Sequence, residues 1–328
     1  MKNFILSLIT VSLILCFTGC SDGTTKYTDY SFECFDTITT IIGYETSKED
    51  FDAVCDEIKT QLMRYHRLYD IYNEYEGINN LCSVNASHGA VKVDTDIIDL
   101  LKFSKEMHAL SGGRVNIAMG SVLSLWHQYR EEGTSIPPEN LLKEASKHTD
   151  INNVIIDENE GAVLLADPQM SLDVGAVAKG YAIEKVAGYL EEKGVSGYLL
   201  NVGGNVRAIG NRGDNKPWTV GVENPDKFSA QAYIEQVELS DQAIATSGNY
   251  QRYYTVNGKN YHHIIDSKTL MPGENFTSVS VICGDAGVAD SLSTTLFLMS
   301  CEEGKELSEK LGADEVIWVL PDGTIKKQ

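Results

Sequence analysis

The order in which helical and strand-like patterns follow one another constrains the fold of this chain more than any other sequence feature. Apolar residues recur with helical spacing through residues 49–72, 94–110 and 176–193, which predicts long helices there. Beyond residue 218, short apolar or alternating runs bounded by turn residues predict mainly strands. Because helices and antiparallel strands come in blocks instead of strict alternation, we expect an α+β fold with mixed or antiparallel sheets and flanking helices.

The same patterns predict the remaining elements. We expect further helices over 139–147, 290–299 and 302–311. We expect strands over 31–44, 154–156, 162–166, 198–202, 218–223, 232–239, 243–246, 250–256, 261–265, 278–282 and 316–320. No linker and no internal repeat divides residues 30–328, so we expect one domain made of two intimately packed lobes.

The charge balance excludes some classes of function. The 328 residues include 27 Lys and Arg against 47 Asp and Glu, a formal net charge of −20. Such a field repels nucleic acid and anionic membrane surfaces unless a basic patch overrides it, and the sequence contains no such patch. We therefore expect no nucleic-acid partner, and we expect an acidic protein that handles phosphates to need a metal ion.

The first twenty residues indicate export. Residues 4–17 are almost all apolar, a run too short to cross a bilayer comfortably but typical of a secretory signal peptide. The run ends in Phe17-Thr18-Gly19-Cys20, which resembles a bacterial lipobox, in which cleavage occurs before an acylated cysteine. We expect residues 1–19 to be a lipoprotein signal peptide and 20–29 a tether that anchors the protein, through lipid on Cys20, outside the cytoplasm on the bacterial cell membrane. A plain signal peptide or an N-terminal anchor helix is the alternative.

One segment combines a helix start with a lysine. Asp173 precedes a tight turn at Gly175, and Lys179 falls in the first turns of the helix predicted over 176–193. Free amide groups at a helix start, with a lysine nearby, suit a phosphate group. Taken alone, a capping aspartate and a solvated lysine are the simpler explanation.

Two glycine-containing segments allow the backbone to approach a ligand closely. Residues 201–207 place Gly203-Gly204 at the end of a predicted strand, and residues 245–250 contain Thr246-Ser247-Gly248. A bulge or a hairpin explains each of them equally well. Neither matches a GxGxxG fingerprint or a P-loop, so neither of those nucleotide-binding folds is indicated.

Two further segments contain candidate catalytic and metal-binding side chains. His262 and His263 lie on a predicted strand, where neighbours point to opposite faces, so at most one faces a given site; a core histidine with satisfied hydrogen bonds is the alternative. Asp290 and Thr294 are four residues apart at a predicted helix start and share one face. One carboxylate, a hydroxyl and several waters suit Mg²⁺, whereas Zn²⁺ would need more His or Cys ligands. A capping aspartate beside a back-bonded threonine is the simpler local interpretation.

Taken together, these segments resemble a known family. In chain order they are 173–181, 201–210, Pro217-Trp218 with Gly221, 246–248, 263–266, and Ala289-Asp290 with Thr294. Six signatures in this order, across residues 30–320, resemble the ApbE-like FAD:protein FMN transferases, formerly called thiamine-biosynthesis lipoproteins. Members of that family split FAD at its pyrophosphate, transfer FMN to a threonine hydroxyl of an exported flavoprotein through a phosphoester bond, and release AMP.

The resemblance implies a specific site in this chain. It implies FAD as substrate, bound between the two lobes, an Mg²⁺ ion, and an exported electron-transfer flavoprotein as acceptor. The implied Mg²⁺ ligands are Asp290, Ser293, Thr294 and the backbone carbonyl of Ala176. The implied FAD contacts are Phe35, Tyr72, Arg114, Val115, Asn116, Asp173, Lys179 and Ile264. His263 matches the family's general base, and we expect an imidazole with a pKa near its ordinary value of about 6.5 to accept the threonine proton, while His262 faces elsewhere.

The chain also departs from the family pattern. The family commonly has Gly where Asp36 stands, Asp where Asn116 stands, Thr where Ala118 stands, and Pro-x-Thr-Gly where residues 267–270 read Ser-Lys-Thr-Leu. None of these changes removes a metal or base candidate. Three other functions fit the same residues: an FAD pyrophosphatase in which water replaces the threonine, a flavin-binding lipoprotein without turnover, and an AMP-releasing enzyme for other dinucleotides.

Overall fold

The computed structural model describes residues 23–31 and 34–328. The predicted signal peptide and the lipidated Cys20 lie outside the described residues, and the predicted tether is described only from Gly23 onward. Within the two described ranges, no helix has the length and apolar character needed to cross a membrane.

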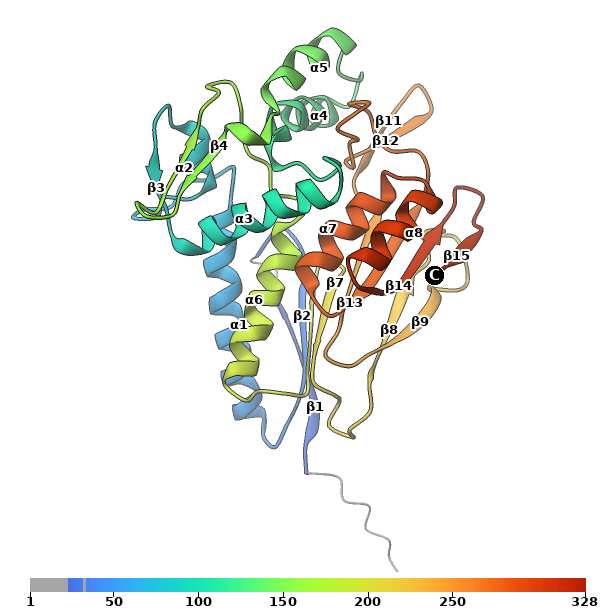
Figure 1. The fold of residues 1–328 in the computed structure, drawn as a ribbon. Coiled ribbons are helices and arrows are strands. Elements are labelled where there is room, and N and C mark those ends of the chain that lie inside the picture. Colours follow the sequence, from blue (N-terminus) through green and yellow to red (C-terminus); the bar gives the residue numbers. More distant parts are fainter. Residues whose placement is uncertain (1–22, 32–33) are drawn as a thin grey trace, which may run out of the picture.

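The centre of the fold is one large antiparallel sheet (Figure 1). Among the described residues it contains eight strands in the order β1-β2-β6-β7-β10-β13-β14-β15, and each neighbouring pair is antiparallel. These strands are β1 Thr25–Ser31, β2 Thr39–Glu45, β6 Tyr198–Val202, β7 Asn205–Ile209, β10 Ala243–Gly248, β13 Ser278–Cys283, β14 Ala313–Val319 and β15 Ile325–Lys327. Because strands from both ends of the chain share this sheet, the two halves of the sequence form one unit.

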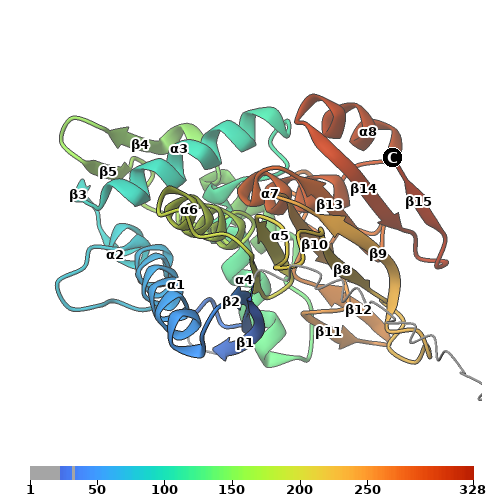
Figure 2. The same cartoon turned by 90° about the horizontal axis from the view of Figure 1, so that it is seen from below.

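Different elements cover the two faces of the sheet (Figure 2). Helices α6 and α7 pack on one face, α1 packs beside α6, and α8 packs on α7 and β14, while the β8–β9 hairpin covers the other face. The bounds are α1 Lys48–Tyr69, α6 Ala178–Glu192, α7 Ala286–Phe297, α8 Cys301–Lys310, β8 Trp218–Glu223 and β9 Tyr233–Leu239. Neighbouring residues of a strand point to opposite faces of the sheet. Leu200 therefore lies in the core under the helices, whereas Leu199 lies in a second core with Trp218 and Val237.

Smaller elements cluster at one end of the sheet, at the top of Figure 1. Trp126 packs with Tyr254 and Ile265 there, and its Nε1 donates to the carbonyl of Leu270 at 2.9 Å. This contact joins α4 to the segment after the β11–β12 hairpin. The elements are α2 Leu81–Ala86, α3 Thr95–Leu110, α4 Gly120–Glu132, α5 Glu139–Ala145, the short helices Ile117–Met119, Ser146–His148 and Ile151–Asn153, the sheet of β3 Val91–Lys92, β5 Ala162–Leu165 and β4 Val154–Asp157, and the hairpin of β11 Tyr253–Val256 and β12 Lys259–His262.

The long predicted helices are confirmed, and their caps explain their ends. The Ser47 side chain accepts the Asp50 N–H at the start of α1, and the apolar stripe of that helix is buried. The helix ends at Tyr69 because Asp70 has an extended backbone, so Tyr72 lies in the loop beyond it. Asp94, predicted as the first residue of the next helix, is its N-cap.

Some predicted elements are placed differently in the structure. The single strand predicted over 31–44 is wrong: β1 ends at Ser31 and β2 begins at Thr39, and Phe35 and Asp36 between them have left-handed backbone angles of 56° and 50° that a strand does not allow. The helix predicted over 290–299 begins earlier, at Ala286, because the side chain of Asp285 accepts the Val288 N–H as N-cap.

Other differences concern the glycine turn and the elements near the site. Gly203-Gly204 forms the turn of the β6–β7 hairpin, with left-handed angles of 60° and 94°, so the hairpin interpretation of that segment is confirmed. The strand predicted over 261–265 ends at His262, which puts His263 just past it. The sequence analysis missed α4, which buries only one narrow stripe containing Val122 and Trp126.

Candidate active site

Five side chains from three parts of the chain influence one another electrostatically. We call this group the active-site hollow and define it by Tyr72, Asp173, Lys179, Arg252 and His263. Tyr72 is 61% exposed and His263 is also exposed, yet burial by surrounding protein is the largest influence on the pKa of Tyr72, Asp173 and His263. Side chains that solvent reaches while protein encloses them on most sides line a hollow.

The charges around the hollow act on one another. The positive charges of Lys179 and Arg252 help to lower the pKa of His263, and Lys179 also acts on Asp173. The charge of Asp173 in turn helps to raise the pKa of Tyr72. Mutual effects of this kind require short separations, so the structure brings these residues together from three distant parts of the sequence.

His263 is held as a neutral imidazole with one nitrogen free. Its backbone N–H donates to the Arg252 carbonyl at 3.2 Å, and its Nδ1 lies 3.3 Å from the same oxygen. Because a carbonyl only accepts, Nδ1 carries the proton and Nε2 keeps its lone pair. Burial, followed by the charges of Lys179 and Arg252, lowers the pKa of His263 to about 3. The expectation of a pKa near the ordinary histidine value is therefore wrong for this site.

His262 has a structural role, and the prediction that it faces elsewhere is confirmed. The side chain is buried, its Nε2 donates to the Gly273 carbonyl at 2.7 Å, and its Nδ1 accepts the Ile264 N–H at 3.2 Å. Its ring meets Phe297 edge-on at 5.4 Å between centroids. Burial lowers the pKa of His262 as well, but both of its nitrogens already have partners.

The turn before α6 is built by Asp173. Its Oδ1 accepts the Gly175 N–H at 2.9 Å, while α6 itself begins behind Val177 without any side-chain cap. The interpretation of Asp173 as a helix cap is therefore wrong. The first amides of α6 are largely occupied within the protein, because the Ala178 N–H donates to the Val174 carbonyl and the Gly180 N–H donates to Asp290, each at 2.9 Å. In the described part of the chain, no hydrogen bond or ion pair occupies the Lys179 ammonium group.

The three predicted metal ligands on α7 lie together. Oδ2 of Asp290 accepts the Gly180 N–H at 2.9 Å, and Ser247 Oγ lies 2.9 Å from Ser293 Oγ and 3.0 Å from Thr294 Oγ1. Asp290 sits inside the helix and is not its cap, so the capping interpretation of this residue is also wrong. The Gly180 bond places Asp290 next to the start of α6, where Ala176 and Lys179 lie.

These residues suit a hard divalent cation. Asp290 is only 6% exposed and has no ion-pair partner within the described ranges, a costly state for a buried carboxylate unless a cation compensates it. Carboxylate, hydroxyl and carbonyl oxygens are the ligands that Mg²⁺ prefers. In the same ranges no group of three or more His, Cys, Asp or Glu side chains could hold a metal, so the arrangement does not suit Zn²⁺.

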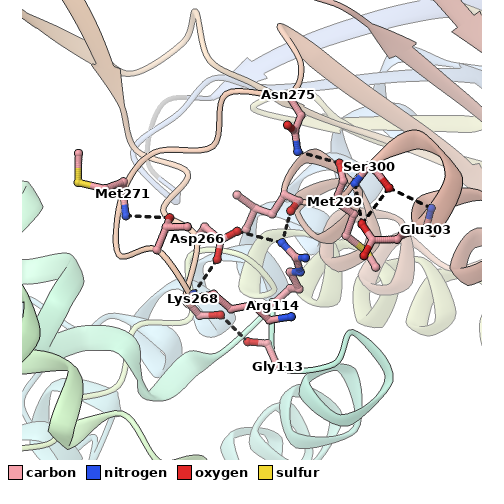
Figure 3. Close-up of polar contacts among 12 residues, drawn as sticks. Gly113, Arg114, Asp266, Lys268, Met271, Asn275, Met299, Ser300 and Glu303 are labelled. Atoms are coloured by element: carbon pink, nitrogen blue, oxygen red, sulfur yellow. Dashed lines mark hydrogen bonds and ion pairs between the residues drawn. The ribbon is translucent and has the colours of Figure 1, made fainter.

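Three of the implied FAD contacts are occupied by bonds within the protein. Arg114 pairs with Asp266 at 2.9 Å, as Figure 3 shows, and it also donates to the Leu298 carbonyl. Val115 is buried, and the Asn116 side chain accepts the Ala118 N–H and donates to the Thr149 carbonyl at 2.9 Å. A flavin contact by these residues stays a prediction.

Phe35 and Ile264 differ in how accessible they are to a ligand. Phe35 is half-buried with its N–H bonded to His66 Nδ1 at 3.2 Å, and the charge of the adjacent Asp36 reaches Tyr72, so this turn borders the hollow. Ile264 is buried, and both of its backbone groups are hydrogen-bonded within the protein.

Sequence reasoning missed three residues at or beside the hollow. His127 and Arg130 come from α4 and act on Asp173 and Tyr72, respectively, and Arg252 holds His263 through its carbonyl. Recognising α4 as a helix would have placed His127 and Arg130 on one face, because residues three apart in a helix are neighbours. No sequence signal distinguishes Arg252.

A cleft of about 830 Å³ lies elsewhere, between α1 and the segments around Ile78 and Val93. It contains none of the residues of the active-site hollow. Three of its four cationic side chains are already paired with carboxylates: Arg64 with Asp94 and Asp96, Lys59 with Asp29, and Lys92 with Glu160.

A histidine with a strongly lowered pKa, an unpaired lysine beside it, and a buried aspartate without an ion-pair partner in the described ranges are features of an enzyme active site. The chain belongs to the ApbE family, whose sequence model matches residues 35–318. This match covers every element of the hollow and all of α7.

Named relatives agree with the family assignment. A protein of Klebsiella pneumoniae called FAD:protein FMN transferase is 31% identical and covers 77% of this chain and 78% of its own length. A protein of the same name from Haemophilus influenzae is 26% identical, with 94% and 91% covered. The crystal structure of the ApbE protein from Thermotoga maritima has a TM-score of 0.82 at 28% identity, and the flavin transferase ApbE from Vibrio cholerae has 0.77 at 25%, each covering 93% of this chain and 97% of its own. The α+β prediction is thereby confirmed.

Proposed function

We propose that this protein is an FAD:protein FMN transferase that uses Mg²⁺ and attaches FMN to a threonine hydroxyl of an exported electron-transfer flavoprotein, releasing AMP. Family membership and the names of the relatives support the transferase activity. The observation that carries the proposal is His263, whose Nε2 is free and unprotonated in a hollow that also contains an unpaired lysine.

Different residues of the hollow suit different parts of the FAD molecule. Lys179 suits the diphosphate of FAD, because its ammonium group has no ion-pair partner among the described residues and presents a positive charge to an anion. Asp173 and Tyr72 belong to the same group of side chains and suit the nucleotide or the flavin. The solvent contact of His263 leaves room for a hydroxyl group of a second protein.

The transfer itself requires one proton to move. The threonine oxygen forms a bond to the phosphorus of the FMN half, the diphosphate P–O bond to AMP breaks, and Nε2 of His263 takes the hydroxyl proton. A bound diphosphate replaces water with negative charge near His263 and so raises the pKa of His263 from its low value, making the imidazole a stronger base when substrate is present.

The metal is proposed to bind at Asp290, Ser293, Thr294 and the Ala176 carbonyl. When bound there, Mg²⁺ would offset the negative charge of the diphosphate and of the AMP leaving group. The protein's own contribution is to hold the ligands: Gly180 fixes one carboxylate oxygen of Asp290, and Ser247 fixes the two hydroxyls.

The decisive experiment is mass spectrometry of an acceptor flavoprotein domain incubated with this protein, FAD and Mg²⁺. We expect the mass of FMN on one threonine of the acceptor and an equal amount of AMP. A reaction without Mg²⁺ and one with the acceptor threonine changed to valine serve as controls. Absence of acceptor modification, with FAD intact, would show a flavin-binding protein without turnover.

A second activity shares the same site. Because His263 is open to solvent, water is able to take the place of the threonine, and the products would be free FMN and AMP. Incubation without an acceptor measures this hydrolysis. Rapid FMN release, together with no labelled acceptor when the acceptor is present, would favour a pyrophosphatase.

We also propose that lipid on Cys20 anchors the protein outside the cytoplasm on the cell membrane. The lipobox-like sequence supports this location. The described chain begins at the end of β1 that lies far from the β11–β12 hairpin (Figure 1), so an anchor at that end would leave the hollow accessible to an acceptor protein.

A further inference from the structure

Arg114 lies in a polar network, most of its own side chain shielded from solvent (Figure 3). It lies in the turn after α3, and its side chain is only 12% exposed. Its Nη1 donates to Oδ2 of Asp266 at 2.9 Å and to the backbone carbonyl of Leu298. One guanidinium group therefore joins two segments that are otherwise far apart in the sequence.

The first of these segments follows the candidate base. Asp266 lies three residues after His263, and its other oxygen accepts the Lys268 N–H at 2.6 Å. Ser267 Oγ donates to the Gly113 carbonyl at 2.9 Å, which fastens the same two segments a second time. The backbone that leaves His263 is thus held against the turn at residues 113–114.

The second segment is the end of the helix that contains the candidate metal ligands. Leu298 is the C-cap of α7, where backbone carbonyls lack helical partners and the helix dipole favours a positive charge. Asn275 Nδ2 donates to the next carbonyl, that of Met299, at 2.9 Å. The end of α7 is therefore held from two sides, and Arg114 is the charged contact.

We propose that Arg114 is a positioning residue that fixes His263 relative to α7, and with it the base relative to Asp290. The inference rests on the proposed function, because it requires His263 to act as the base and Asp290 to bind the metal. A displacement of about 1 Å at a reacting centre costs on the order of 100-fold in rate, so a buried bridge between these two segments controls turnover without touching the substrate. This role differs from the FAD contact that the family resemblance implies for Arg114.

The test uses a pair of substitutions that compensate in length. Arg114→Lys keeps the charge but shortens the side chain by one bond, and Asp266→Glu adds one bond on the other side. The matched control is Arg64→Lys, since Arg64 also pairs with carboxylates, Asp94 and Asp96, but lies outside the hollow. For each full-length variant, kcat is measured with saturating FAD, Mg²⁺ and acceptor, the Kd for FAD is measured by flavin fluorescence, and a melting curve confirms folding.

We expect Arg114→Lys to lower kcat at least tenfold and to change the Kd for FAD less than threefold. Adding Asp266→Glu should regain at least threefold in kcat, and Arg64→Lys should change neither quantity. An unchanged kcat for Arg114→Lys, a tenfold weaker Kd for FAD, or no recovery in a folded double variant would each overturn the positioning role. Turnover by the wild-type protein tests the proposed function separately, because the positioning role is measured only as a ratio to it.

Discussion

At the scale of single residues, the two adjacent histidines show how surroundings decide function. Burial lowers the pKa of both, but His262 uses both ring nitrogens to hold Gly273 and Ile264, whereas His263 keeps Nε2 free at a solvent-accessible surface. The sequence predicts that they point in different directions. Only the hydrogen bonds show which of them is available as a base.

Replacing His263 by alanine should remove the base without removing the binding site. We expect kcat for FMN transfer to fall by about 10²- to 10⁴-fold, while FAD affinity changes little. Rapid-quench assays of AMP release measure the first quantity, and flavin fluorescence measures the second. His88→Ala is the control, because His88 is exposed and outside the hollow. Transfer at the wild-type rate in His263→Ala would exclude His263 as the base.

The lowered pKa of His263 makes a prediction about pH. A depressed pKa means that the imidazole stays unprotonated as the pH falls, until the pH approaches about 3. Because kcat/KM reports the free enzyme, it should lack an acid limb near the ordinary histidine pKa of about 6.5. Rates measured from neutral pH down to the limit of protein stability check this. Burial raises the pKa of Asp173, so this carboxyl group could itself produce an acid limb in the pH profile. The Asp173→Asn variant identifies such a limb, because it lacks the carboxyl group.

A limb centred near the ordinary histidine value in both proteins would contradict the environment described for His263. In the wild-type protein alone, such a limb would instead be assigned to the carboxyl group of Asp173.

Ser247 should control the metal site through its contacts with Ser293 and Thr294. Ser247→Ala removes the hydroxyl that orients both ligands, and we expect Mg²⁺ affinity to fall by about 10- to 100-fold. Isothermal titration with MgCl₂ measures the affinity. Thr246→Val is a matched control, because Thr246 bonds Ser280 instead, at 2.7 Å. Equal Mg²⁺ affinity in the two variants would show that Ser247 does not orient the ligands.

At the scale of elements, the site depends on how closely α6 approaches α7. A Cβ atom on Gly180 would collide with the Ala286 carbonyl and with Cβ of Asp290. Glycine at this position therefore allows the two helices to touch, and its N–H then reaches Asp290. By contrast, Gly188 in the same helix has nothing within 4 Å of where a Cβ would lie.

Two alanine substitutions in α6 should consequently have opposite effects. Gly180→Ala forces the helices apart, and we expect it to lower the free energy of unfolding by about 1–3 kcal/mol. Gly188→Ala adds helix propensity in open space and should raise the free energy of unfolding by about 0.5–1 kcal/mol. Urea denaturation of both variants measures these changes. Equal effects in the two variants would mean that the α6–α7 contact is not as close as described.

The success of element prediction followed the strength of the local signal. The helix α1 was predictable because its apolar stripe and its Ser47 cap agree. The break between β1 and β2 was not, because it depends on a left-handed backbone angle at Phe35, which a bulky residue rarely adopts. In α7, Asp285 is the N-cap, whereas Asp290 lies inside the helix at the candidate metal site. The spacing of residues in the sequence does not show which of the two aspartates caps the helix.

At the scale of the whole molecule, the site is a product of the sheet order. Strands β7 and β10 are neighbours in the sheet although more than thirty residues separate them, and α6 and α7 pack together on that sheet. Segment-by-segment reasoning found Asp173, Lys179, His263 and Asp290, and the family resemblance joined them. That Arg252, Gly180 and Ser247 hold these residues became apparent only from the packing, because they act through backbone groups or through other side chains.

The orientation of the molecule toward its membrane gives the last prediction. Because β1 starts at the end of the sheet remote from the β11–β12 hairpin, an anchor before β1 does not need to disturb the hollow. In a bacterial host, we expect the wild-type protein to incorporate labelled palmitate and to sediment with membranes, and Cys20→Ala to do neither. The kcat/KM values of the two purified proteins should agree, since Cys20 precedes every described element. Label on the Cys20→Ala variant, or none on the wild-type protein, would favour a plain signal peptide or an anchor helix, and unequal kcat/KM values would show that the anchor reaches the site.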